Sequence, residues 1–358
     1  MRDRRIDMKF LSYFFLFISF FVLSSCNSSS STGLAGNFTA FSYTGAGSNT
    51  NWRMVLNTTG AFAAIESISN TSVLGTYSRD ISGFVKIQIT SAAGASAPTT
   101  FPINLAGLEL PGVAFVMQPI FSSETALITA VLSGNCPGNS IAANYIYTQF
   151  NSSDNMTSAA KGFFGTSVFL SDSGTASAPT YYTLSGGYPK ANAGFATGSG
   201  ICFNGISNLS NQSVDYVMSS GSFIKFANGG DTSGLISIPT QTLTTMASLT
   251  GNYAGLVYDG AAGTVFPIQT VLTPSGNTAP LILNNVSTTD LVTTTTQYAT
   301  MTLTNVDSPS AGFVPGTIGG NNIMCTGNPG FTGKNSLICV GQNPSNSTKP
   351  VVVFLTSR

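Results

Sequence analysis

Thiols are the reactive side chains that this sequence offers, because it contains five cysteines and no histidine. The absence of imidazole removes the commonest general base and a common metal ligand. Cys26 stands apart from the other four, between an apolar run and a row of serines, in the stretch FVLSSCNSSS. Its position favours covalent modification of the thiol, whereas the others favour pairing among themselves: Cys136, Cys202, Cys325 and Cys339.

The residues before Cys26 form a basic start followed by an apolar run. Within residues 1–9 the net charge is plus two, from Arg2, Arg4, Arg5 and Lys9 against Asp3 and Asp7. The run from Phe10 to Leu23 carries no charge and is shorter than the roughly 20 residues that span a bilayer. The pattern predicts a secretory signal peptide over residues 1–25. A buried helix is the alternative, but it would be apolar on every side and would lack capping residues.

The end of the apolar run, Leu23-Ser24-Ser25-Cys26, resembles the lipobox of bacterial lipoproteins. The resemblance implies that the thiol of Cys26 receives a diacylglyceryl group, that a peptidase cuts before it, and that the new amino terminus is acylated, as with palmitate. Two or three chains hold stably, because each buried methylene contributes about 0.8 kcal/mol and one chain alone binds reversibly. The alternative is an ordinary cleavage site followed by a chance cysteine.

A polar, small-residue segment follows the anchor from Asn27 to Gly33. Such a segment has nothing to bury and therefore predicts a flexible tether, so that residues 26–33 comprise the lipidated cysteine and its tether. In proteobacterial lipoproteins, an Asp after the cysteine retains the protein in the inner membrane. Asn27 in that place favours lipid anchoring in the outer membrane, facing the periplasm or the cell exterior.

The composition of the chain from Cys26 onward excludes some classes of partner. It has nine Lys and Arg (13 minus 4) and eleven Asp and Glu (13 minus 2), for a net charge of about minus two. Charged residues make up 7% of the whole sequence, far below the roughly 25% of ordinary domains. No basic patch suits a nucleic acid. No later segment has 18 consecutive apolar residues, so no membrane-spanning helix is expected.

The four remaining cysteines predict two disulfides in an exported protein, with three possible connectivities. Cys325 and Cys339 are the favoured pair, because they lie in two short predicted strands around a Gly/Pro-rich loop. Closing that loop contributes about 3 kcal/mol in the chain-entropy model. Cys136 and Cys202 then pair by elimination. Metal binding is disfavoured, since there is neither a CxxC spacing nor a histidine.

The sequence contains an internal repeat. The segments Leu34–Ala46 and Leu249–Ala261 align without a gap, with six of thirteen positions identical. A second match follows in each, VLNTTG from Val55 and VLTPSG from Val271. A weaker third copy begins at Ala143. We therefore predict three β units, over residues 34–141, 142–248 and 249–358, the middle one being the weak repeat. Recurrence by composition alone is the alternative.

The units are predicted to be all-β, as tandem antiparallel meanders that form sandwiches or small barrels. Apolar and polar residues alternate strictly from Gly83 to Thr90, with Val85, Ile87 and Ile89 on one face. Gly60 marks a hairpin turn. The L-x-G-N-[FY] opening of the repeat is similar to the first strands of lipocalin-like and avidin-like barrels; this likeness of pattern transfers no ligand.

A catalytic site has little support in the sequence. It contains no G-x-S-x-G elbow, no P-loop and no dinucleotide fingerprint, and we predict no catalytic, cofactor-binding or metal-binding residue. The carboxylates from residue 26 onward are scattered: Glu66, Glu109, Glu124 and eight aspartates. Aromatic residues such as Trp52, Tyr145, Tyr147, Tyr181 and Tyr182 are candidates for a binding surface, but such residues on strands more often pack in a core.

Three functions remain open. The favoured one is a non-catalytic, lipid-anchored module of the cell envelope that binds an unknown protein or glycan of the envelope, or of a host or prey surface. The second is a lipocalin-like barrel that binds a small apolar ligand. The third is an enzyme with an unrecognised pair of carboxylates.

Overall fold

The computed structural model describes residues 40–47, 50–110, 113–121, 127–132, 141–149, 163–169, 176–184, 200–203, 206–209, 215–218, 223–226, 233–329 and 334–358. In these ranges the secondary structure consists of strands and one short 3-10 helix, so the all-β prediction is confirmed. The same ranges contain no helix with the length and apolarity to cross a membrane. The predicted signal peptide, lipobox and tether lie outside them.

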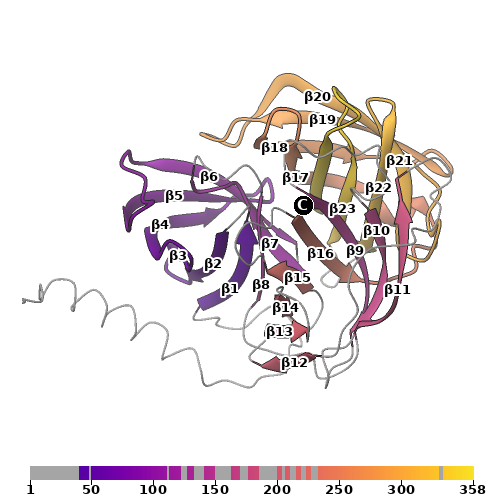
Figure 1. The fold of residues 1–358 in the computed structure, drawn as a ribbon. Coiled ribbons are helices and arrows are strands. Elements are labelled where there is room, and N and C mark those ends of the chain that lie inside the picture. Colours follow the sequence, from indigo (N-terminus) through magenta and orange to yellow (C-terminus); the bar gives the residue numbers. More distant parts are fainter. Residues whose placement is uncertain are drawn as a thin grey trace, which may run out of the picture. The chain divides into compact units, whose positions relative to one another are not determined.

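Eight antiparallel strands form a closed barrel, which we call the first barrel (Figure 1). Its strands are β1 (Ala40–Gly47), β2 (Thr50–Asn57), β3 (Ala61–Glu66), β4 (Thr71–Arg79), β5 (Phe84–Ala93), β6 (Ile103–Leu110), β7 (Ala114–Met117) and β8 (Ile128–Leu132). Neighbours in sequence are neighbours in the sheet, and β1 pairs with β8 to complete the ring.

A second barrel has the same organisation at the carboxyl end of the chain. Its strands are β17 (Gly251–Asp259), β18 (Thr264–Leu272), β19 (Thr278–Val286), β20 (Thr293–Thr304), β21 (Phe313–Ile318), β22 (Asn321–Pro329), β23 (Asn335–Gln342) and β24 (Pro350–Ser357). Closure is made by β17 and β24, which pair from Tyr253 with Ser357 to Asp259 with Val351.

Between the barrels in sequence lies an open sheet of eight strands, the middle sheet. It contains β9 (Ile141–Gln149), β10 (Phe163–Phe169), β11 (Ala176–Thr183), β12 (Gly200–Phe203), β13 (Ile206–Leu209), β14 (Asp215–Met218), β15 (Phe223–Phe226) and β16 (Ser233–Pro239). Its first and last strands pair with each other, as in the barrels, and the order is interrupted between β11 and β12. The circular order of strands is therefore shared by all three sheets.

The sequence repeat falls on equivalent strands of the two barrels. Its first element covers β1 and β17, and its second ends in the hairpins β2–β3 and β18–β19. Gly60 and Gly276 occupy these two hairpins with φ of +84° and +61°, a region in which glycine has no steric penalty. The two barrels are thus related units.

Each barrel is filled by its own side chains. One buried cluster belongs to the first barrel and contains Trp52, Met54, Phe62 and Ile87, and another belongs to the second barrel and contains Tyr253, Ile268 and Val353. These seven side chains are at most 1% exposed. Eight-stranded barrels have interiors that side chains just fill, and these two follow that rule in the part of the chain that is described.

A third buried cluster joins all three sheets. The first barrel contributes Phe84 and Leu108, the middle sheet Ile146, and the second barrel Leu256 and Phe354. On β24, Val353 and Leu355 belong to the barrel interior, whereas Val352 and Phe354 belong to this shared cluster. Residues 41–358 accordingly form one compact unit. The division into domains at 34–141, 142–248 and 249–358 stays a prediction.

The segment before β17 closes one end of the second barrel. It contains the 3-10 helix η1 (Met246–Leu249). Leu243, Met246 and Leu249 are buried within the interior cluster of the barrel. The backbone N–H of Leu243 donates to the carboxylate of Asp307, at 2.9 and 3.1 Å from its two oxygens. The loop between β20 and β21 thereby holds the segment before β17 in place.

The disulfide between Cys325 and Cys339 is present inside the second barrel. The two residues face each other on β22 and β23, with their Cα atoms 3.9 Å apart and both side chains fully buried. Cys136 and the side chain of Cys202 lie outside the described residues, so their pairing stays a prediction.

Candidate functional site

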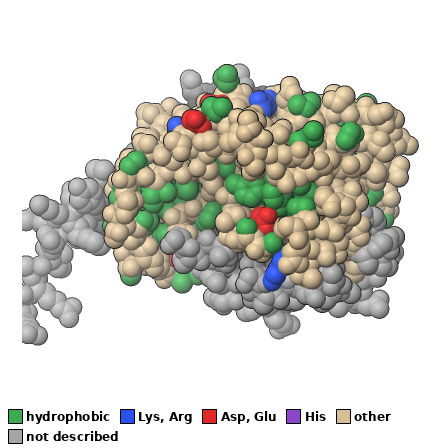
Figure 2. Space-filling view, turned by 90° about the horizontal axis from the view of Figure 1, so that it is seen from above, with side chains coloured by type: hydrophobic (Ala, Val, Ile, Leu, Met, Phe, Trp, Pro, Cys, Tyr) green, Lys and Arg blue, Asp and Glu red, His purple; other side chains and the backbone are tan. Residues whose placement is uncertain are grey.

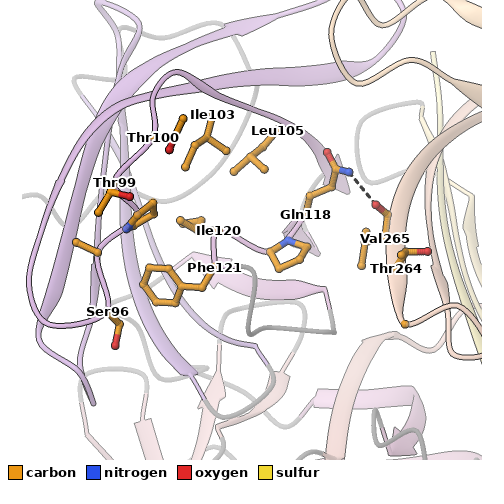
Figure 3. Close-up of a pocket in the computed structure, with 14 residues that line it drawn as sticks. Ser96, Thr99, Thr100, Ile103, Leu105, Gln118, Ile120, Phe121, Thr264 and Val265 are labelled. Carbon is orange, nitrogen blue, oxygen red and sulfur yellow. Dashed lines mark hydrogen bonds between the residues drawn. The ribbon is translucent and has the colours of Figure 1, made fainter.

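A pocket of about 750 Å³ opens at one end of the first barrel (Figure 3). Three segments line it: residues 96–105 from the β5–β6 loop and the start of β6, residues 118–121 after β7, and residues 263–265 of the β17–β18 hairpin. Its volume lies within the range of roughly 300–1,000 Å³ that is usual for small-molecule sites. The second barrel therefore supplies one wall of a hollow whose other walls come from the first barrel.

The floor of the pocket is apolar because it is the end of the barrel's own core. Leu105, Ile120 and Phe121 are buried members of the first barrel's interior cluster, and Ile103 packs against that cluster. The ring of Phe121 lies 5.1 Å from the ring of Trp52. A molecule in the pocket would therefore contact side chains that continue into the barrel interior.

Gln118 fixes the distance between two walls of the pocket. Its amide oxygen accepts a hydrogen bond from the backbone N–H of Ala106, at 2.8 Å, and its amide NH₂ donates to the carbonyl of Val265, also at 2.8 Å. Figure 3 shows this second bond running from the first barrel to the hairpin of the second. Because Gln118 is buried, both bonds are shielded from competing water.

The hairpin wall is held in shape by Asp259, at the end of β17. Its carboxylate accepts hydrogen bonds from the backbone N–H groups of Ala261 and Ala262, at 2.8 and 2.9 Å. The side-chain amide of Asn343 donates to the same carboxylate at 2.6 Å. Burial and the negative charge of Asp259 raise the pKa of the nearby Tyr298 hydroxyl well above its ordinary value. The hairpin that carries Gly263 and Thr264 is thus preorganised.

The opposite wall carries hydroxyl groups. Ser96, Thr99 and Thr100 lie on the exposed β5–β6 loop, and Thr264 is exposed across the hollow from them (Figure 3). The loop begins at Gly94, whose φ is +129° and where a Cβ would lie 2.7 Å from Thr71. Only glycine suits that close approach, so the loop leaves β5 in a defined direction.

None of the described residues that line this pocket is ionisable. The described carboxylates are occupied elsewhere, each as a hydrogen-bond acceptor: Glu66, Asp80, Glu109, Asp259, Asp290 and Asp307. On the face drawn in Figure 2, charged side chains are few, while hydrophobic side chains gather in hollows of the surface. The described part of the lining suits binding of an uncharged group.

The aromatic candidates from the sequence lie in the core where their side chains are described. Trp52 and Tyr145 are fully buried, and Tyr182 stacks on Phe164 with ring centroids 5.3 Å apart. The side chains of Tyr147 and Tyr181 lie outside the description. Among the described side chains, no group of three or more His, Cys, Asp and Glu is placed to hold a metal.

The residues that build the pocket have no signature in the sequence. Gln118 and Val265 are 147 positions apart, and only the packing of the two barrels brings them together. Their types are ordinary for strands and loops. The composition of the chain gives only an indirect indication of the site. Because the sequence is apolar and poor in charge, it predicts that a binding surface is uncharged.

Comparison with known proteins identifies no family. No family model matches the chain, and a search of curated proteins also finds no match. One solved structure is similar in part, that of the isotype 1 transferrin binding protein B from serogroup B Neisseria meningitidis. The alignment covers 87% of this chain and 65% of that one, less than two thirds of it, with 11% identity and a TM-score of 0.20.

Proposed function

We propose that this chain is a lipid-anchored, non-catalytic binding protein of the outer membrane, and that the pocket at the end of the first barrel is its binding site. The observation that carries the proposal is a preorganised hollow of about 750 Å³ with an apolar floor, in which the lining residues that the structure describes are all uncharged. Sites of this kind bind through shape and burial rather than through acid–base chemistry. The partner is a component of the envelope or of a surface that the cell meets.

The pocket is a better candidate than either barrel interior. The interior clusters leave side chains such as Trp52 and Tyr253 fully buried, so a ligand there would have to displace core packing. A small apolar ligand, as in the lipocalin-like alternative, would therefore bind at the end of the first barrel and not in its interior. There Ile103 and Phe121 form an apolar surface.

The carboxylate-enzyme alternative is disfavoured among the described residues. Glu66 and Asp307 each accept hydrogen bonds from backbone N–H groups, and Glu109 is paired with Arg79 at 2.7 Å. Carboxylates used in this way hold loops and strands in place. A glycosidase-type mechanism needs two carboxyl groups across one substrate, and the described part of the pocket lining contributes none.

Cys26 supplies the membrane anchor in this proposal. We expect that Cys26→Ser abolishes acylation of the chain, because serine has no sulfur with which to form the thioether. The chain then either appears in the soluble fraction after cleavage or stays uncleaved, with its signal peptide attached. Mass spectrometry of the purified protein and fractionation of the cells measure this result. A matched Cys202→Ser variant serves as the control, and a Cys26→Ser chain that is cleaved and unacylated but still in the membrane fraction would contradict the anchor.

Photo-crosslinking in intact cells tests the binding site. A photoreactive amino acid in place of Thr264 is expected to give an adduct of defined mass, because this exposed threonine lies on the rim of the pocket. The same replacement at Thr296, an exposed threonine of β20 outside the pocket, is the matched control. Equal labelling at the two positions, or no adduct at Thr264, would contradict the proposal. The mass of the adduct separates a small ligand from a protein or a glycan.

A further inference from the structure

We infer that the pocket takes an uncharged single-chain amphiphile, with its alkyl chain on the floor and a neutral, hydroxyl-bearing head at the rim. This inference rests on the proposed binding function and adds the chemical class of the ligand. Three features carry it: the absence of charge among the described lining residues, the continuity of the floor with the barrel core, and the hydroxyl-bearing residues at the rim.

The described lining residues offer no counter-charge to a charged group on the bound part of the ligand. An ion that leaves water needs a counter-charge or several strong hydrogen bonds, and burial without them costs several kcal/mol. Gln118 has already committed its amide oxygen to Ala106 and its NH₂ group to Val265. The nearby carboxylate of Asp259 is committed to the hairpin and to Asn343. Gln118 carries no charge, and Asp259 is not among the described lining residues, so neither supplies a counter-charge inside the pocket.

The floor favours an alkyl chain over a sugar. Sugars bind on exposed aromatic faces and through dense arrays of polar side chains, whereas the lining aromatic residue Phe121 is 7% exposed and packs against Trp52. Ile103, Leu105 and Ile120 complete an aliphatic surface. Each methylene that moves from water onto such a surface contributes up to about 0.8 kcal/mol.

The rim favours a neutral polar head. Ser96, Thr99 and Thr100 lie on one side of the hollow, and Thr264 lies on the other (Figure 3). A hydroxyl both donates and accepts, so the three hydroxyl-bearing residues of the β5–β6 loop suit the hydroxyls and ester oxygens of a glycerol-type head. Because the rim residues are exposed, the head remains in contact with water while the chain is buried.

Trp52 provides a built-in reporter for this pocket. It is the single tryptophan of the chain, it is fully buried, and its ring contacts the ring of Phe121 on the pocket floor. Occupation of the floor changes the packing around Phe121 and therefore the emission of Trp52. No other tryptophan contributes to the signal.

The test uses the mature chain, residues 26–358 with Cys26→Ser, which retains every described residue. Trp52 emission is titrated with a monoacylglycerol, with the fatty acid and with the alkyltrimethylammonium ion of the same chain length, each below its critical micelle concentration, and with a neutral trisaccharide. We expect the monoacylglycerol to bind at least ~10-fold more tightly than either ion, which corresponds to about 1.4 kcal/mol. The same titration on the acylated chain distinguishes an external lipid, which then still binds, from occupation by the protein's own anchor chains.

Variants connect this binding to the pocket. Ile103→Asp places a charge on the floor and is expected to weaken monoacylglycerol binding at least ~10-fold, whereas Ile282→Asp, at an exposed isoleucine of β19, leaves it unchanged. If Ile103→Asp does not fold, Thr264→Lys tests independently whether the ligand binds in this pocket. A cation at the rim shifts the preference towards the fatty-acid anion, and Thr296→Lys, its exposed control, does not.

Equal affinity for the three chain molecules, a Trp52 response to the trisaccharide alone, or no response to any of the four overturns the ligand class. A peptide adduct at photoreactive position 264 also overturns it but leaves the binding function intact. Failure of the function itself has a different signature, which is the absence of any adduct at that position.

Discussion

Cys325→Ala combined with Cys339→Ala lowers the free energy of unfolding by about 3 kcal/mol through loss of the cross-link alone. The disulfide closes a loop with a sequence separation of 14 between neighbouring strands of the second barrel. Without it the unfolded chain gains conformational entropy. The loss is larger in practice, because both sulfurs are fully buried in the interior cluster and their removal leaves a cavity.

Denaturant unfolding followed by circular dichroism measures this change, with Val353→Ala as the matched control. Val353 pairs with Cys339 in the sheet and belongs to the same cluster, so its truncation creates a cavity without removing a cross-link. The slope of free energy against denaturant should rise for the cysteine variant, whose unfolded state is more extended, and stay unchanged for the control. A cysteine variant no less stable than Val353→Ala would contradict an entropic contribution of the disulfide.

Strands that face a single core were predictable from the sequence, because apolar and polar residues alternate along them with a period of two. Val85, Ile87 and Ile89 were predicted to share a face, and on β5 all three are buried while Lys86 is half-buried and Thr90 is exposed. The hairpin at Gly60 was also predicted. Both signals are local, since they depend on residues within one strand or one turn.

The shared core was not predictable, because it removes the alternation that marks a strand's inner face. All eight residues of β24 are buried, since one set faces the barrel interior and the other faces the cluster that joins the three sheets. A continuous apolar run such as VVVFL predicts a buried strand but not which side is the lumen.

The pocket was not predictable for a related reason. Its floor consists of ordinary core residues, Leu105 and Ile120, and its far wall is the β17–β18 hairpin, more than 140 positions away. The recurrence of the LxGN motif located the two barrels in the sequence but carried no information on which faces pack together. The position of Gln118 against Val265 follows only from that packing.

Glu66 is a buried carboxylate of the first barrel. It lies opposite Trp52 in the β2–β3 pairing and is 1% exposed. Its oxygens accept hydrogen bonds from the backbone N–H groups of Asn51, Ile68 and Ser69 and from the Ser69 hydroxyl. Burial raises the pKa of Glu66, but these hydrogen bonds outweigh burial and leave the pKa below its ordinary value of 4.5. The folded protein thus stabilises the charged form.

Glu66→Ala lowers the free energy of unfolding by about 3 kcal/mol or more at neutral pH, because it leaves buried backbone donors without an acceptor. The pH dependence has a defined sign. Since the folded-state pKa is depressed, the unfolded chain takes up the proton first as the pH falls. The stabilisation by Glu66 is fully present above about pH 4.5, the ordinary value, and is lost as the pH falls through the lower folded-state pKa.

Trp52 emission during denaturant unfolding, repeated between pH 7 and pH 3, measures this dependence at the residue that faces Glu66 across the strand pair. The wild-type chain should lose stability over that interval, and Glu66→Gln, which cannot ionise, should start lower and lose less. Asp290→Asn is the control, because Asp290 also has a lowered pKa but sits on an exposed turn of the second barrel. Equal slopes for the wild type and Glu66→Gln would show that another group governs the acid response, whereas a flatter slope for Glu66→Gln alone assigns it to this carboxylate.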